Sequence, residues 1–136
     1  AAASAGGMVA AWGVSGGRVF AGTGYRSGSG LPRLSKRGGS GIATEQYFLD
    51  GKTFQNHHGG MVLVGGHIYA GQGHRMGLPI CIELATGKMM WEEPKLGSGT
   101  IVRAGDQFVI LSDTGELQLA TATSAASIAS GCWART

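Results

Sequence analysis

Short apolar runs alternate with glycine-containing turns through the middle of the chain, and this pattern predicts β-strands. Between Gly59 and Pro94 there are four such runs: Met61–Val64, His67–Ala70, Pro79–Leu84 and Lys88–Trp91. They are too short for helices, rich in Val, Ile and aromatic residues, and separated by turn signals. We therefore expect four antiparallel strands joined in order. A lone four-stranded meander cannot bury both of its faces, so copies of it are expected to pack beside one another.

The same pattern recurs on both sides of this segment. Val14–Gly24 (VSGGRVFAGTG) matches Val64–Gly73 (VGGHIYAGQG), and a weaker third copy occupies Arg103–Ala120. Three aromatic residues fall in equivalent places in these copies: Phe20, Tyr69 and Phe108. A period of roughly forty to fifty residues with four strands per unit is typical of a β-propeller blade. The alternative is one irregular sandwich with coincidental glycine turns.

We predict an all-β fold, a partial β-propeller of four-stranded antiparallel meander blades. The approximate blades are residues 8–54, 59–94 and 99–123, and residues 124–136 form a connector or a tail. In the first blade, the polar, glycine-rich Ser35–Gly41 is predicted as a loop and Glu45–Leu49 as the last strand. Closed propellers have about 4–8 blades, so three blades leave exposed apolar faces. The chain is therefore expected to be part of a larger protein that supplies the remaining blades.

Composition and charge narrow the classes of function. The 26 glycines supply the positive-φ turns that many short strands need. The net charge is +3, and the basic residues are spread along the chain except for the close group Arg33, Lys36 and Arg37. Nucleic-acid binding would need denser clustering, so we predict none. No run approaches the roughly 18 apolar residues of a membrane helix, so no transmembrane segment is predicted.

The chain has two cysteines, Cys81 and Cys132. They could pair, but one possible bridge is not a disulfide framework, and the redox compartment stays open. Cys81 lies in an apolar strand, where a buried, inert thiol is expected.

LATGKMMW (Leu84–Trp91) resembles the repeat of the PQQ-binding-like, quinoprotein-type β-propellers. That repeat usually reads Ala-Leu-Asp, a few residues, Thr-Gly-Lys/Glu, two residues and Trp, and Glu83-Leu84 stands here where Leu-Asp is common. The resemblance covers roughly residues 8–120. Thr86-Gly87 would make the turn between the third and fourth strands. The indole of Trp91 would lie between neighbouring blades, and Tyr47 would take the same place in the first blade.

The resemblance implies a non-catalytic repeat module, acting as a scaffold or as a ligand- or protein-binding face of a larger bacterial protein. It suggests a periplasmic or exported location and a protein or polysaccharide partner. The alternative is a fragment of a PQQ-dependent (quinoprotein) alcohol dehydrogenase, in which PQQ with Ca²⁺ takes the electrons. Family members that bind PQQ carry an adjacent cysteine pair and a carboxylate and amide set for Ca²⁺. Neither is visible in this sequence, so no cofactor is assigned.

Strand order predicts which loops lie together. In a meander, alternate connections emerge at the same end of the sheet, so the loops between second and third strands share one face with the links between blades. This face is polar, aromatic and cationic, which suits an anionic or polar ligand. Its candidate residues are Tyr25, Arg26, Asn56, His57, His58, His74 and Arg75. For the histidine pair, one packed or hydrogen-bonded ring beside Gly59-Gly60 is favoured over a metal site.

The sequence specifies no catalytic machinery. The serines lack a G-x-S-x-G elbow, and the aspartates Asp50, Asp106 and Asp113 lie in predicted turns, where Asp is favoured for local hydrogen bonding. No triad and no paired general acid and base can be assigned. A hydrolase built on the cationic face would therefore have no nucleophile, and we assign no catalytic, cofactor-binding or metal-binding residue.

Overall fold

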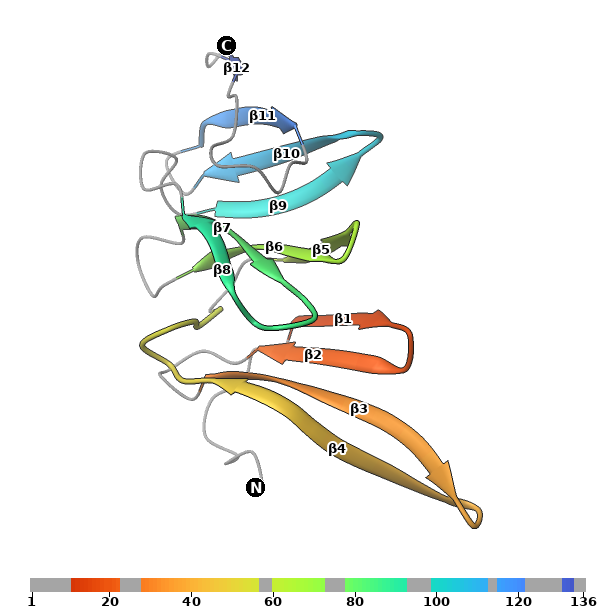
Figure 1. The fold of residues 1–136 in the computed structure, drawn as a ribbon. Coiled ribbons are helices and arrows are strands. Elements are labelled where there is room, and N and C mark those ends of the chain that lie inside the picture. The colour runs from red at the N-terminus through yellow and green to blue at the C-terminus, as the bar shows by residue number, and fades with distance from the viewer. Residues whose placement is uncertain are drawn as a thin grey trace.

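The computed structural model describes residues 11–22, 28–56, 60–72, 78–92, 99–112, 115–121 and 131–133. Within these ranges the chain is all-β, which confirms that part of the predicted fold, and no described helix is long and apolar enough to span a membrane. The described residues form twelve strands in three sheets of four strands each, and in every sheet the strands lie side by side in chain order with antiparallel neighbours (Figure 1).

The strands of the three sheets have the following bounds. The first sheet contains β1 (Ala11–Ser15), β2 (Arg18–Gly22), β3 (Ser29–Arg37) and β4 (Ser40–Leu49). The second sheet contains β5 (Met61–Val64), β6 (His67–Gln72), β7 (Leu78–Glu83) and β8 (Met89–Glu92). The third sheet contains β9 (Gly99–Ala104), β10 (Gln107–Ser112), β11 (Leu117–Thr121) and β12 (Gly131–Trp133).

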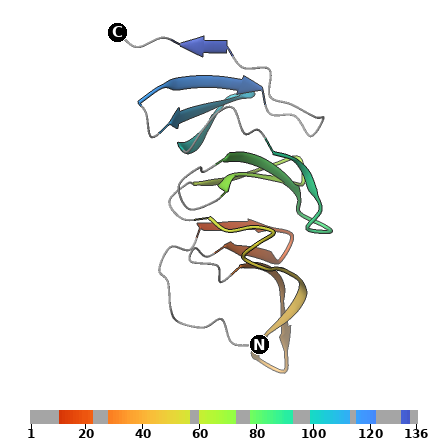
Figure 2. The same cartoon turned by 90° about the vertical axis from the view of Figure 1, so that its left-hand side faces the viewer.

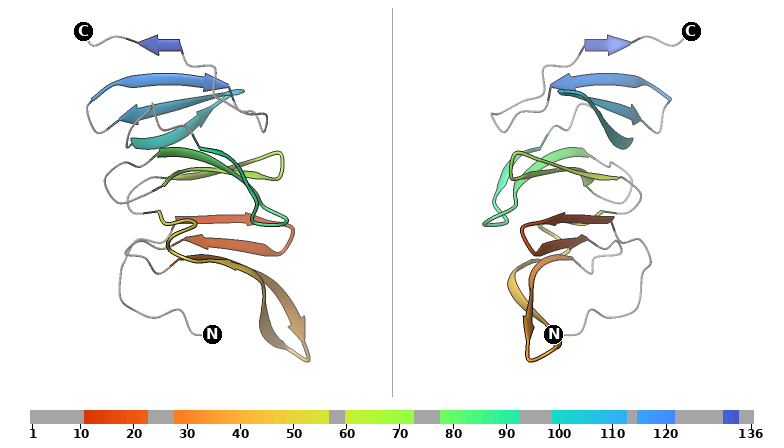
Figure 3. Two further views of the ribbon diagram at one scale, coloured as in Figure 1. Left: turned by 60° about the vertical axis from the view of Figure 1, so that its left-hand side comes forward. Right: turned by 90° about the vertical axis from the view of Figure 1, so that its right-hand side faces the viewer.

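The three sheets stack face to face in chain order, with the second sheet between the other two (Figures 2 and 3). We call the face of each sheet that points toward the next sheet its forward face, and the opposite face its rear face. Side chains alternate between the two faces along each strand. Among the described residues, the second sheet is covered on both faces, whereas the first and third sheets each bury one.

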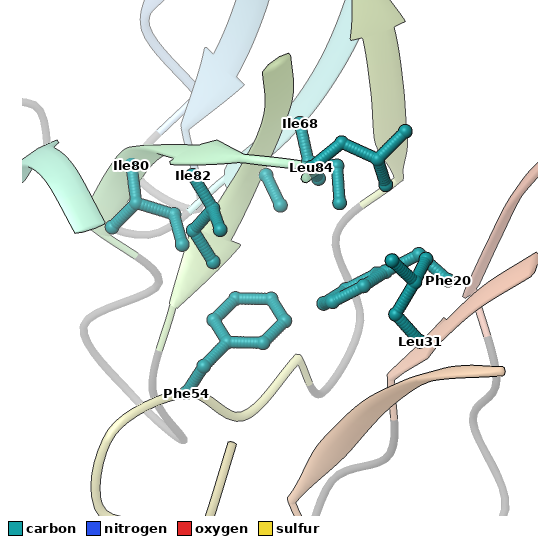
Figure 4. Close-up of a cluster of buried hydrophobic side chains, with 8 residues drawn as sticks. Phe20, Leu31, Phe54, Ile68, Ile80, Ile82 and Leu84 are labelled. Atoms are coloured by element: carbon teal, nitrogen blue, oxygen red, sulfur yellow. The ribbon is translucent and has the colours of Figure 1, made fainter. Parts of the chain in front are cut away.

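The first interface joins the forward face of the first sheet to the rear face of the second. The rings of Phe20 and Phe54 lie side by side there, with centroids 5.9 Å apart (Figure 4). Aliphatic side chains of β6 and β7 close over them. The buried members of this cluster are Phe20, Leu31, Phe54, Ile68, Ala70, Ile80, Ile82 and Leu84. This apolar burial provides the main driving force for stacking the two sheets.

The second interface joins the forward face of the second sheet to the rear face of the third. Its rings are closely packed, since the centroids of Tyr69 and Phe108 lie 4.6 Å apart and those of Tyr69 and Trp91 lie 6.1 Å apart. The side chain of Trp91 is 7% exposed. The predicted position of this indole between neighbouring sheets is therefore confirmed. The buried members of this cluster are Tyr69, Cys81, Trp91, Ile101, Phe108, Ile110 and Ala120.

Strand register shows that the first two sheets place equivalent residues in matching cross-strand rows. Tyr69 pairs with Cys81, which pairs with Trp91, so these three residues form a row across the second sheet. In the first sheet, the equivalent row contains Phe20, Leu31 and Tyr47. Tyr47 therefore occupies the place of Trp91, as predicted.

Backbone details repeat as well. The Leu34 N–H donates to the Gly17 carbonyl at 2.7 Å, and the Leu84 N–H donates to the Gly66 carbonyl at 2.9 Å. The pairing of the third strand with the fourth also shifts register at the same place in both sheets, after Leu31 in β3 and after Cys81 in β7.

The predicted equivalence of Phe108 with Phe20 and Tyr69 is wrong. Turn residues set the register of a hairpin, and Gly105-Asp106 occupies the place of Gly65-Gly66. Counted from these turns, Tyr69 corresponds to Val109, and Phe108 corresponds to Ile68. Phe108 accordingly lies on a rear face, whereas Phe20 and Tyr69 lie on forward faces. A shift of one residue moves a strand side chain to the other face of its sheet.

The predicted loop at Ser35–Gly41 is also wrong. These residues form the ends of β3 and β4 and the two-residue turn between them, and Arg37 pairs with Ser40 across that turn. Gly38 and Gly39 have φ angles of 57° and 85°, the left-handed values that a tight hairpin turn requires at both positions. In the C-terminal segment 124–136, predicted as a connector or tail, β12 instead pairs with β11 as the fourth strand of the third sheet.

The forward face of the third sheet is apolar and exposed. Val102 is 58% exposed, Leu111 46% and Leu117 42%. Val109 and Leu119, which are partly buried, complete the patch, because Val109 pairs with both Val102 and Leu119. We call these five residues the open apolar face. No described segment covers it.

Candidate functional site

The predicted ligand face falls mostly on residues that the structure does not describe. Six of its seven candidates lie outside the described residues: Tyr25, Arg26, His57, His58, His74 and Arg75. Their shared face stays a prediction. Asn56, the seventh, is described, and so are the strand ends on either side of the undescribed segments.

Asn56 is placed by a local turn. The Asp50 carboxylate accepts hydrogen bonds from the backbone N–H groups of Lys52 at 3.0 Å and Thr53 at 2.8 Å. The Asp50 carbonyl accepts from Phe54 N–H at 2.9 Å. The hydrogen bonds to the carboxylate, led by that from the Thr53 N–H, lower the pKa of the Asp50 carboxyl. The turn sends the Phe54 ring into the first interface and leads the chain to Asn56 between the first two sheets.

The Asn56 side chain is completely buried and only half satisfied. Its Nδ2 donates to the Gly71 carbonyl at 3.2 Å, near the end of β6, and its exposed fraction is 0%. Its Oδ1 is buried without a hydrogen-bond partner. Buried polar atoms are normally paired with protein or water, so each exception needs a physical explanation.

Two further buried polar atoms without partners lie at the same end of the same interface. Ser29 Oγ is on the forward face of the first sheet, where β3 begins, and Gln72 Oε1 is on the rear face of the second, where β6 ends. A Cβ atom on Gly22 would lie 3.1 Å from Ser29 Oγ and 2.9 Å from Met61 Cε. The serine hydroxyl is therefore in the seam between the sheets, and glycine at position 22 keeps space beside it.

Ser29, Asn56 and Gln72 together form what we call the strand-end site. The serine hydroxyl can donate or accept a hydrogen bond, whereas the two amide oxygens only accept. This set fits a donor group such as a water molecule, a hydroxyl, an amide or an ammonium. The three side chains do not titrate, and the described residues place no general base beside Ser29. The arrangement is suited to binding.

The titratable groups with clearly raised pKa values lie in the two interfaces. Burial raises the pKa of Tyr47 to about 12, partly opposed by the Arg18 charge. Burial likewise raises the pKa of Tyr69 to about 12 and that of the Cys81 thiol to about 11. Cys81 is a free, buried cysteine, as expected from its apolar strand. All three groups are neutral at physiological pH, and their shifts reflect packing in the core.

The assignment of no cofactor stays a prediction. The two cysteines stand at positions 81 and 132 and are not adjacent in sequence, and the Cys81 thiol is enclosed with Tyr69 and Trp91 in the second interface. Within the described residues, no group of three or more His, Cys, Asp or Glu side chains could hold a metal ion.

Asn56 is predicted for the ligand face, and the structure buries its side chain completely, whereas Ser29 and Gln72 are not singled out by the sequence. Both missed residues follow or precede glycine-rich turns and look like ordinary polar strand ends. Their significance comes from burial by the opposing sheet, for which the sequence carries no local signal. No protein-family model matches this chain, and no curated protein sequence matches it at a significant level.

Proposed function

We propose that this chain is a non-catalytic repeat module of the PQQ-like β-propeller type, a scaffold whose sheets act as blades. The single observation that carries the proposal is the open apolar face of the third sheet. The next sheet buries the forward face of the first sheet, which carries Phe20, and likewise that of the second sheet, which carries Tyr69 at the equivalent place. The third sheet carries Val109 at that place with no described segment over it.

The occupant of the open apolar face is a further four-stranded sheet of the same kind. Val102, Leu111 and Leu117 lie on adjacent strands and form an aliphatic patch. The rear face of a further sheet, with Ile or Phe at its centre as in the second and third sheets, could pack against this patch. Burying such side chains contributes about 1.5–3 kcal/mol each, so the patch favours association strongly. Exposed patches of this kind mark interaction sites in soluble proteins.

The scaffold presents its binding face at the strand ends. The predicted ligand face supplies the loops there. A protein or polysaccharide is the partner that the resemblance implies for this face. Among the described residues, no observation favours the alternative, a fragment of a quinoprotein alcohol dehydrogenase.

Sedimentation velocity tests whether the open apolar face is an association surface, as the proposed module requires. We expect the chain to self-associate as its concentration rises, because association buries the open apolar face. The triple variant V102T/L111K/L117T should stay monomeric with an unchanged melting temperature. The matched control L34T/I42T, which removes exposed apolar side chains from the hairpin of the first sheet, should associate like the parent. A parent chain that is a compact, cooperative monomer at all concentrations would overturn the proposal.

A further inference from the structure

The β3–β4 hairpin extends beyond the rest of the first sheet. β2 begins at Arg18, which pairs with Arg33, so the residues from 34 to 43 form a two-stranded ribbon with no third strand beside them. All of these residues are exposed, and the ribbon projects away from the stack in Figure 1. A two-stranded hairpin alone is only marginally stable in water, so this ribbon contributes little to the core. Its chemistry is therefore available for contacts.

The ribbon and its base carry the positive charge of the protein. Residues 33–44 contain Arg33, Lys36 and Arg37 and no acidic residue, which equals the net charge of +3 for the whole chain. The remainder of the chain is formally neutral. An anionic partner would therefore be attracted to the ribbon ahead of any other part of the described surface.

Arginines gather on one face of the ribbon. Arg18 and Arg33 are direct cross-strand partners, and cross-strand partners point to the same face of a sheet. Arg37 follows Arg33 on that face after four residues, about 13 Å along the strand. The nearest acidic residue of the ribbon, Glu45, pairs with Pro32 and so lies on the opposite face.

The cross-strand arginine pair lacks a counter-charge within the described residues. The ion pair found there joins Arg103 to Asp106 at 3.9 Å, in the third sheet. Directly opposed like charges destabilise a strand pair. An oxyanion placed between Arg18 and Arg33 would remove this repulsion, and guanidinium groups bind carboxylate, sulfate and phosphate through two parallel hydrogen bonds.

Hydroxyl groups lie between the arginines on the same face. Ser35 lies between Arg33 and Arg37 on this face of β3, opposite the apolar Ile42. Thr44 and Ser40 are the cross-strand partners of the two arginines on β4. Guanidinium and hydroxyl groups in one row suit a chain that carries both oxyanions and hydroxyls. Single-stranded nucleic acid is bound on aromatic stacking platforms, and this face of the ribbon has no aromatic residue.

We infer that the face formed by Arg18, Arg33 and Arg37 with Ser35, Ser40 and Thr44 binds an acidic polysaccharide. The Arg18–Arg33 pair holds one oxyanion, Arg37 holds a second further along the polymer, and the hydroxyls contact the sugar rings between them. This surface lies at the opposite end of β3 from the strand-end site and on a different sheet from the open apolar face. The inference is therefore independent of the proposed module.

Binding of polygalacturonate at low ionic strength tests the inference. We expect the chain to bind this polymer and to show no binding to dextran, a neutral polysaccharide. R33Q/R37Q should weaken binding about tenfold or more, since it removes both oxyanion contacts. K52Q/R103Q, which removes the same charge elsewhere on the exposed surface, should change affinity less than about twofold. Melting temperatures of all variants should stay close to the parent, because every substituted side chain is exposed.

Four outcomes would overturn the inference. An equal loss in K52Q/R103Q would mean that only net charge matters. Galacturonate monomer binding as tightly as the polymer would mean an isolated anion pocket. A single-stranded oligonucleotide that binds more tightly than polygalacturonate at equal charge concentration would assign the ribbon to nucleic acid instead. Absence of binding to polygalacturonate at low salt would also reject the assignment.

Discussion

Tyr47 Oη donates a hydrogen bond to the Leu84 carbonyl oxygen at 2.9 Å and so links the first sheet to the second. Tyr47 lies in β4, and Leu84 directly follows β7. The Tyr47 ring also packs against Phe20, with centroids 6.4 Å apart. One side chain therefore combines apolar burial with a polar contact across the interface. In the second sheet the corresponding position is held by the Trp91 indole, which packs against Tyr69.

Replacing Tyr47 with Phe should destabilise the chain by about 1 kcal/mol at neutral pH, because the Leu84 carbonyl loses its donor while the ring remains. Urea unfolding followed by circular dichroism measures the change. Phe48→Leu on the exposed rear face of the same strand is the control and should stay within about 0.5 kcal/mol of the parent. A Tyr47→Phe variant as stable as the parent would show that this hydrogen bond adds nothing to stacking.

Much of the fold could be predicted from local pattern because its strands alternate between two buried faces. The second sheet is the clearest case: β5 coincides with the predicted run Met61–Val64, and the other three strands differ from their predicted runs by one or two residues at the ends. Thr86-Gly87 lies in the turn region between β7 and β8, where Gly87 has a φ of 76°. These features depend on residues close in sequence.

The misplaced residues show where local pattern is insufficient. Aromatic character alone places Phe108 with Phe20 and Tyr69, but the Gly105-Asp106 turn fixes the register one residue away from that alignment. Ser35–Gly41 is polar and rich in glycine, as loops are, yet Gly38-Gly39 satisfies the geometry of a two-residue hairpin turn. The strand-end site depends on contacts between sheets, so the buried Ser29 and the half-buried Gln72 could not be found from neighbouring residues.

Phe108 and Val109 provide a direct test of the corrected register. Phe108 is 0% exposed in the second interface, and Phe108→Ala should cost about 3–5 kcal/mol. Val109 lies on the open apolar face, so Val109→Ala should cost about 1 kcal/mol or less. Chemical denaturation of both variants in parallel gives the comparison. Equal losses, or a larger loss for Val109→Ala, would contradict the assignment of these neighbours to opposite faces.

Alkaline pH should destabilise the folded chain. Burial raises the pKa of Tyr47 to about 12 and that of Tyr69 to about 12, above the ordinary value of 10.0. The folded state therefore favours the neutral phenols, and this contribution is complete below pH 10 and lost as the pH rises toward 12. Urea midpoints measured from pH 7 to 12 should fall in this window. The gap between the parent and Tyr47→Phe should narrow there, and a flat profile would contradict the prediction.

The Cys81 thiol should be unreactive in the native chain. It is 0% exposed, and burial raises its pKa to about 11, while the hydrogen bond from Tyr69 acts in the opposite direction. Thiolate is the reactive form, so little of it exists at pH 8. Alkylation by iodoacetamide, read by peptide mass spectrometry, should modify Cys81 only when denaturant is present. Rapid modification under native conditions would show that the second interface opens readily.

Gly87 and Gly65 separate the cost of backbone conformation from the cost of close packing. Both have positive φ, 76° and 55°, so alanine strains the backbone at either position. A Cβ on Gly87 would lie 2.7 Å from Tyr47 Cε2, whereas a Cβ on Gly65 would meet nothing within 4 Å. Gly65→Ala should cost about 1–2 kcal/mol from the backbone alone. Gly87→Ala should cost more, because the ring must shift and its hydrogen bond to Leu84 must stretch or break.

Combining each with Tyr47→Phe in a double-mutant cycle should show coupling for Gly87 and additivity for Gly65. Additivity at both positions would mean that the turn of the second sheet does not rest on the Tyr47 ring.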